Sequence, residues 1–148
     1  MTPQEKSEDM LTNENTDSDI KEAGKKYVKD LGGTFDDQIY QDIEILGKKL
    51  KKVWSTDKRA YIIGNGGSAA IANHFMTDMT KNTKIKCVSL SDTSLITCLA
   101  NDFGYENLNQ KYIEYNGNIG DVLIAISSSG ESKNIINACK KAKKLKFS

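Results

Sequence analysis

Residues 60–68, with the sequence AYIIGNGGS, carry the pattern most indicative of the fold class. Four residues suited to a buried strand run directly into a turn with three glycines, and a helix-length segment begins at Ala69. Ser68 stands just before this segment, where a serine hydroxyl can accept a hydrogen bond from a free amide of the first turn. We therefore predict a strand, a glycine turn and a helix capped by Ser68.

Two further apolar runs follow the same scheme, at residues 85–90 and 122–126. The runs at 60–63 and 122–126 are apolar at every position, which is typical of strands covered on both faces, whereas 85–90 partly alternates and indicates a more peripheral strand. Each run is followed by a segment long enough for a helix. This alternation predicts an α/β fold with a parallel sheet. The helices are expected at 68–81, 94–101, 105–115 and 131–144.

The residues before the first strand divide into a polar tail and two helices. Residues 1–18 carry too little apolar surface to fix a conformation, so we expect a disordered tail. Helical periodicity then begins at Ile20 and stops at the pair Gly32-Gly33. A second helix is predicted over 36–54, and we expect its apolar stripe to pack on the domain's own sheet, with a second subunit as the alternative. The stripe consists of Ile39, Ile43, Leu46, Leu50 and Val53.

Composition suits one globular domain of 148 residues, with 38% hydrophobic and 28% charged side chains. A net charge of +1 gives no field that favours nucleic acid or an anionic membrane surface. No apolar stretch approaches the ~20 residues that span a bilayer, and the polar start is unlike a secretory signal, so a cytoplasmic location is expected. Cys87, Cys98 and Cys139 are predicted to be reduced thiols in the core.

Two loops carry the candidate chemistry, and both follow an apolar strand and open a helix. In the first, residues 64–68, glycines allow a ligand to approach the backbone and the helix start favours an anion. The second, SSSGES at 127–132, offers hydroxyls that can hold a phosphate without arginine. Both loops should meet at the carboxyl edge of the sheet. The first loop lacks the lysine of a Walker motif and the spacing of the dinucleotide fingerprint, so neither nucleotide class is supported.

These loops, together with SLITCLANDFGYE at 94–106 and GDVLIAISSSGES at 120–132, resemble the phosphoheptose isomerases and their sugar isomerase (SIS) domain relatives. The resemblance runs from about residue 36 to the last residue. It implies a flavodoxin-like three-layer α/β/α sandwich that forms a homotetramer. It also implies conversion of sedoheptulose 7-phosphate to D-glycero-D-manno-heptose 7-phosphate, which supplies heptose for lipopolysaccharide or another surface glycan.

The resemblance also implies roles for individual residues. His74 stands where the family can have a zinc ligand, and Asp78 stands where the family has a glutamate that is catalytic and binds the metal. Aspartate is one methylene shorter, so a contact tuned to glutamate would fall ~1 Å short. At a helical spacing of four, His74 and Asp78 can share one ion or only pair with each other. The implied substrate contacts are Asn65, Gly66, Gly67, Ser68 and Asp102, with the phosphate held by Ser127, Ser128, Ser129 and Ser132.

The family pattern continues beyond Ser148. By the resemblance, later strands and a carboxyl-terminal helix with a glutamine and a histidine are missing, so an SIS domain over 19–148 is expected to be incomplete and inactive alone. The strand at 122–126 would then have an open edge that favours aggregation. Isomerisation must move protons between two carbons and two oxygens, and the chain has one histidine. The alternative to an isomerase is a phosphosugar-binding or regulatory module without catalysis, or an inactive gene fragment.

Overall fold

The structure is a computed structural model that describes residues 17–148. The predicted tail lies outside the described residues as far as residue 16, and residues 17 and 18 already belong to a helix. The chain divides into two compact units, residues 1–43 and 44–148. All candidate site residues belong to the second unit.

The first unit contains α2, Asp17–Gly33, and the beginning of α3, Asp37–Ser55. Helix α2 ends at the glycine pair, as predicted. Asp36 caps α3, since its carboxylate accepts a hydrogen bond from the Ile39 amide at 2.9 Å. Large apolar side chains of α2 are exposed, among them Tyr27 and Val28.

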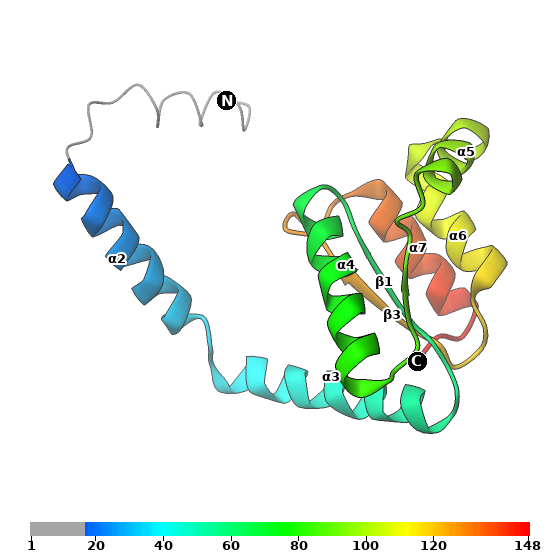
Figure 1. The fold of residues 1–148 in the computed structure, drawn as a ribbon, viewed down its shortest axis with the longest axis horizontal. Helices are drawn as coiled ribbons and strands as arrows, with labels where there is room; N and C mark the ends of the chain where they lie inside the picture. Colours follow the sequence, from blue (N-terminus) through cyan, green and yellow to red (C-terminus); the bar gives the residue numbers. More distant parts are fainter. Residues whose placement is uncertain (1–16) are drawn as a thin grey trace. The chain divides into compact units, whose positions relative to one another are not determined.

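The second unit contains a parallel sheet of three strands in the order β2-β1-β3, of which Figure 1 labels β1 and β3. The strands are β1, Ala60–Gly64, β2, Cys87–Ser89, and β3, Val122–Ile126. Ala60 lies opposite Cys87 on one side and opposite Val122 on the other, so β1 is the central strand. The predicted parallel sheet is confirmed, with β2 shorter than the apolar run that predicted it.

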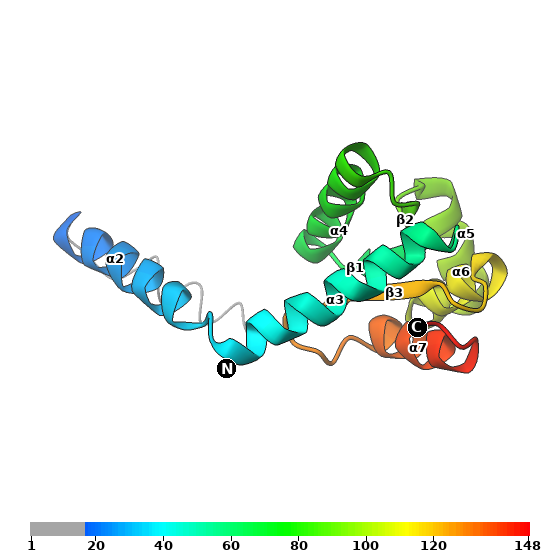
Figure 2. The same ribbon diagram turned by 90° about the horizontal axis from the view of Figure 1, so that it is seen from below.

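Helices cover both faces of this sheet, which makes the predicted three-layer α/β/α arrangement. Figure 2 shows α4, Gly67–Asp78, and α7, Lys133–Lys144, on opposite sides of the strands. Successive side chains of β1 point to opposite faces of the sheet, as the pleat of a strand requires. Ala60 and Ile62 pack in the cluster with α3 and α4, and Ile63 packs with α7 and with α6, Leu108–Asn116.

The apolar stripe of α3 packs on the sheet at its carboxyl-terminal part. Leu50 and Val53 are buried in the same cluster as Ala60 and Ile62, and Leu46 packs against that cluster. Ile43, by contrast, is 54% exposed. Packing on the domain's own sheet is therefore confirmed for the last two turns of the stripe.

The remaining elements connect the layers. Helix α4 continues as a π-helical turn, Met79–Thr83, and α5, Thr93–Phe103, is capped by Asp92, whose carboxylate accepts from the Leu95 amide at 2.7 Å. A short 3-10 turn, Tyr105–Asn107, leads into α6. Over the described residues, no helix is both long enough and apolar enough to cross a membrane.

The prediction that all three cysteines are core thiols is wrong for two of them. Cys87 is buried, and burial raises the pKa of its thiol, whereas Cys98 and Cys139 are exposed. Leu99 lies on the buried face of α5, and Ala138 lies on the buried face of α7. A neighbouring helical residue points about 100° away, so Cys98 and Cys139 turn outward.

The prediction that β3 is covered on both faces is also only partly right. Val122 is buried, but Ala125 is exposed and the other positions are half-buried. Among the described residues β3 pairs with β1 alone, so its other edge is open, as expected from the resemblance.

Candidate functional site

The first loop connects β1 to α4 through backbone geometry that only glycine accommodates. A Cβ on Gly64 would lie 2.5 Å from the carbonyl carbon and oxygen of Ser68, because the first turn of α4 returns over the end of the strand. Gly66 has φ 51°, a conformation that side chains disfavour. Helix α4 starts at Gly67 with Gly66 in the capping position. Ser68 lies inside the first turn, so its predicted role as N-cap is wrong.

The second loop is held in shape by its own serines. Ser127 Oγ accepts from the Gly130 amide and Ser129 Oγ accepts from the Glu131 amide, both at 3.1 Å. Each of these hydroxyls keeps its O–H donor. Ser128 is exposed.

Helix α7 presents free donors at its amino terminus. Ser132 occupies the capping position, but its side chain makes no capping hydrogen bond. Its carbonyl accepts from the amides of Ile135 and Ile136 at 3.0 Å. The amides of Lys133 and Asn134 have no acceptor in the part of the chain that the structure describes. Free amides at a helix start, beside a hydroxyl and an ammonium group, suit an anionic ligand.

A pair of amide side chains joins the first loop to the first turn of α7, directly after the second loop. Asn65 Nδ2 donates to Asn134 Oδ1 at 2.9 Å, and Asn134 Nδ2 donates back to Asn65 Oδ1 at 2.7 Å. The Tyr105 hydroxyl donates to the same Asn65 oxygen at 3.1 Å. Asn134 is buried, so this junction is fixed. The loops therefore meet at the carboxyl end of the central strand, where the chain switches from one side of the sheet to the other.

Two pockets meet at this junction and share Asn65 and Tyr105. The glycine-loop pocket has a volume of about 210 Å³, and the serine-loop pocket has about 360 Å³. The shared residues, Asn65 and Tyr105, are hydrogen-bonded to each other and lie between the two pockets. The glycine-loop pocket is lined by Gly64, Asn65, Gly66, Ala69, Leu90, Ile96, Tyr105, Leu108 and Asn109. The serine-loop pocket is lined by Asn65, Tyr105, Glu106, Ser132, Lys133 and Asn134.

His74 and Asp78 lie together, but in a different place. His74 Nε2 is 3.4 Å from Asp78 Oδ2 on the exposed face of α4. They line a separate groove of about 570 Å³ with Ile71, Ile124 and Ile126, and this groove shares no residue with the two pockets.

The donor set at this pair does not make a zinc site by itself. A structural zinc usually has four protein ligands and a catalytic zinc three. Within residues 17–148 no three His, Cys, Asp or Glu side chains come together as such a group. His74 and Asp78 supply two donors.

Some of the predicted substrate residues line the two pockets, and others do not. Asn65 and Gly66 line the glycine-loop pocket and Ser132 lines the serine-loop pocket, while the other predicted loop residues lie beside them in the same loops. Asp102 is exposed on α5 and lines neither pocket. Its carboxylate accepts from Asn101 Nδ2 at 2.9 Å.

Several lining residues were missed by sequence reasoning. Tyr105 and Glu106 are the last two residues of the segment at 94–106, and the resemblance of this segment to the family could have identified them as site residues. Lys133 and Asn134 directly follow the serine loop. Asn109 had no signal, because nothing in the pattern distinguishes it from an exposed helical asparagine.

Comparisons with known proteins agree with this architecture. The SIS domain family matches residues 25–148. The phosphoheptose isomerase of Helicobacter pylori strain P12 is 40% identical over 131 residues, which are 84% of this chain and 64% of that protein. The phosphoheptose isomerase of Fusobacterium nucleatum is 39% identical over 70% of this chain and 56% of its own length. The chain thus spans less than two thirds of these relatives.

Two solved structures show the same fold. The phosphoheptose isomerase of Neisseria gonorrhoeae superposes with a TM-score of 0.64 at 38% identity, over 68% of this chain and 55% of that one. A phosphoheptose isomerase from Francisella tularensis gives a TM-score of 0.65 at 23% identity, over 82% of this chain and 72% of that one.

Proposed function

Since this chain belongs to the SIS domain family, we propose that it binds a phosphorylated sugar at its two loops. The observation that supports this most is the Asn65–Asn134 junction, which holds a glycine loop and a serine loop at one edge of the sheet. The two pockets on either side of the junction offer a place for the phosphate and a place for the sugar.

The phosphate would lie at the amino terminus of α7. There the free amides of Lys133 and Asn134 and the hydroxyl of Ser132 supply donors, and the Lys133 ammonium supplies opposite charge. Ser127, Ser128 and Ser129 would add their O–H donors from the loop. Asn65, Gly66, Gly67 and Ser68 would hold the sugar from the first loop.

The activity that we propose is that of a phosphoheptose isomerase, which interconverts sedoheptulose 7-phosphate and D-glycero-D-manno-heptose 7-phosphate. Asp78 is the proposed proton-transferring group, with Asp102 as a further substrate contact and His74 and Asp78 as two ligands of a zinc site. We also propose a cytoplasmic homotetramer, with residues 19–148 as its SIS domain.

A second function is binding without turnover. This function is favoured by the position of the His74–Asp78 pair, which lines a groove separate from both pockets. The side chain of His74 is 79% exposed and that of Asp78 is 52% exposed. A phosphosugar held at the junction would then act as a regulatory signal.

Calorimetric titration with sedoheptulose 7-phosphate tests the proposal. Ser132→Ala removes a phosphate donor without removing a helix cap, so affinity should fall roughly tenfold or more, as expected for a hydrogen bond to a charged group. Ser55→Ala, which changes an exposed serine at the end of α3, is the matched control and should bind like the unchanged chain. Absence of binding by the unchanged chain would contradict the proposal, and product formation in the same samples decides between isomerase and binding module.

A further inference from the structure

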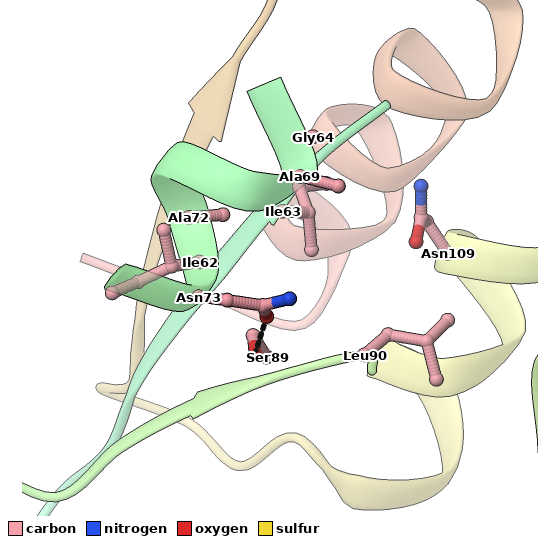
Figure 3. A pocket seen from close by; sticks show the side chains of 9 residues that line it. All are labelled: Ile62, Ile63, Gly64, Ala69, Ala72, Asn73, Ser89, Leu90 and Asn109. Carbon is pink, nitrogen blue, oxygen red and sulfur yellow. Dashed lines mark hydrogen bonds between the residues drawn. The ribbon is translucent and has the colours of Figure 1, made fainter. Parts of the chain in front are cut away.

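Asn109 is a buried polar residue that faces the glycine-loop pocket. It lies in the first turn of α6 and is 4% exposed. It also lines a small void of about 10 Å³ whose other lining residues include Asn73 and Ser89. Figure 3 shows its carboxamide directed from α6 into the space between Ala69 and Leu90.

The other polar side chains around this space already have partners. Asn65 bonds with Asn134 and Tyr105, and the Ser89 hydroxyl donates to Asn73 Oδ1 at 2.6 Å, as drawn in Figure 3. The Asn109 carboxamide makes no hydrogen bond with any residue from 17 to 148. In that same range no fully enclosed side-chain nitrogen or oxygen lacks a partner, so this carboxamide opens into the pocket.

Because the carboxamide opens into the pocket, its two donors and its acceptor face the pocket and no hydrogen-bonding group of the described residues. The neighbouring buried residues of α6, Leu108 and Ile113, are apolar. A polar side chain at this position, with its hydrogen-bonding groups left open to the pocket, suits a ligand that binds there.

We propose that Asn109 is a specificity-determining residue whose carboxamide binds a hydroxyl group of the sugar, while the phosphate is held in the serine-loop pocket. The inference rests on the proposed function. A hydroxyl both donates and accepts, which matches a carboxamide, and the glycine-loop pocket contains no charged side chain that would prefer an ion. Leu90, Ile96 and Leu108 supply apolar surface for the carbon skeleton.

The inference predicts that Asn109 contributes to sugar binding but not to phosphate binding. Asn109→Leu should weaken sedoheptulose 7-phosphate binding roughly fivefold to tenfold, the effect of one neutral hydrogen bond. Its affinity for inorganic phosphate should be unchanged, because the phosphate is proposed to lie in the serine-loop pocket, which Asn109 does not line. Asn116→Leu is the matched control, since Asn116 is an exposed asparagine at the end of the same helix and lines neither pocket.

A spectroscopic measurement on the unchanged chain makes the test independent of how the variant folds. The side-chain amide resonance of Asn109, assigned through its bonds to the backbone, should shift when sedoheptulose 7-phosphate is added and stay in place with inorganic phosphate. If the sugar phosphate binds but this resonance does not move, or if Asn109→Leu binds it as tightly, the inference is overturned and the proposed function stands. If the unchanged chain binds no sugar phosphate, both are overturned.

Discussion

Gly64 shows how a single residue shapes the first loop. The end of β1 and the first turn of α4 approach so closely that a methyl group at this position would overlap the Ser68 backbone. The sequence indicated a glycine turn here, but not that Gly64 serves close packing whereas Gly66 serves a positive φ. Serine favours the capping role, so the sequence predicts Ser68 as the cap, but the helix starts earlier, with Gly66 in the capping position.

We expect Gly64→Ala to lower the free energy of unfolding by about 1–3 kcal/mol, the usual cost of forcing an extra methyl group into a packed site. The contact is with backbone atoms, which cannot rotate away. Urea unfolding measures the effect. Gly67→Ala is the control, because a Cβ there meets no atom within 4 Å. Equal stability of the two variants would contradict this account of the loop.

Asp121 is a buried carboxylate that holds the start of β3. Its Oδ1 accepts from the Arg59 amide at 2.9 Å and its Oδ2 accepts from the Asn118 amide at 2.8 Å. In Asp121→Asn one acceptor becomes an NH₂ group that faces a donor, so the free energy of unfolding should fall by about 1–3 kcal/mol. Thermal denaturation measures this loss of stability, with Asp102→Asn at an exposed position as the control variant. A melting temperature like that of the control would disprove the role of Asp121.

Tyr61 links two elements, the central strand and the end of α6. Its hydroxyl donates to the Asn116 carbonyl at 2.6 Å, and its ring contacts Phe147 with centroids 5.6 Å apart. Burial raises the pKa of Tyr61, a larger effect than the opposing one of Arg59, and the charge of Asp121 acts in the same direction as burial. The folded state therefore favours the neutral phenol.

Because the pKa of Tyr61 is raised in the folded state, the stability of the protein depends on pH in the alkaline range. The contribution of Tyr61 is complete below the pKa of an unfolded tyrosine, about 10, and is lost as the pH rises through the higher folded pKa. Tyr61→Phe should lower stability near pH 7 by about 0.5–1.5 kcal/mol and make the alkaline loss less steep. Burial also raises the pKa of Tyr112, so part of that loss remains. Urea unfolding from pH 7 to 11 would count against this prediction if both proteins showed the same alkaline slope.

Most elements of the second unit could be predicted from periodicity, because their apolar runs and glycine stops are local signals. Boundaries were less predictable where tertiary contacts set them. The strand β2 keeps only Cys87–Ser89 of a six-residue apolar run, since pairing with β1 involves only those residues. Apolar neighbours in the sequence predict core positions for Cys98 and Cys139, but both are exposed, because burial depends on which side of each helix packs inward.

At the scale of the whole molecule, one edge of β3 pairs with no other strand among residues 17–148. Ile124 and Ile126 line an apolar groove beside this edge with Ile71, which is 58% exposed. Such a combination of free strand edge and apolar surface favours association. The resemblance predicted the open edge, but the groove could not be read from the sequence, because α4 and β3 are far apart in the chain.

We therefore expect the 148-residue chain to associate as its concentration rises, with Ile71→Lys reducing the effect by placing a charge in the groove. Size-exclusion chromatography with light scattering over a concentration series measures the mass. Tyr40→Lys, an equally exposed change in α3, is the control for added charge. A constant monomer mass for the unchanged chain would show that the edge and groove do not drive association.

The glycine loop and the serine loop are proposed to form one phosphosugar site. The most direct test of this proposal is a titration of the ¹⁵N-labelled chain with sedoheptulose 7-phosphate, followed through the backbone amides of Gly66, Gly67, Lys133 and Asn134. The account predicts that amides of both loops shift with one common dissociation constant. Shifts confined to one loop, shifts only around His74 and Asp78, or no shifts at all would contradict it.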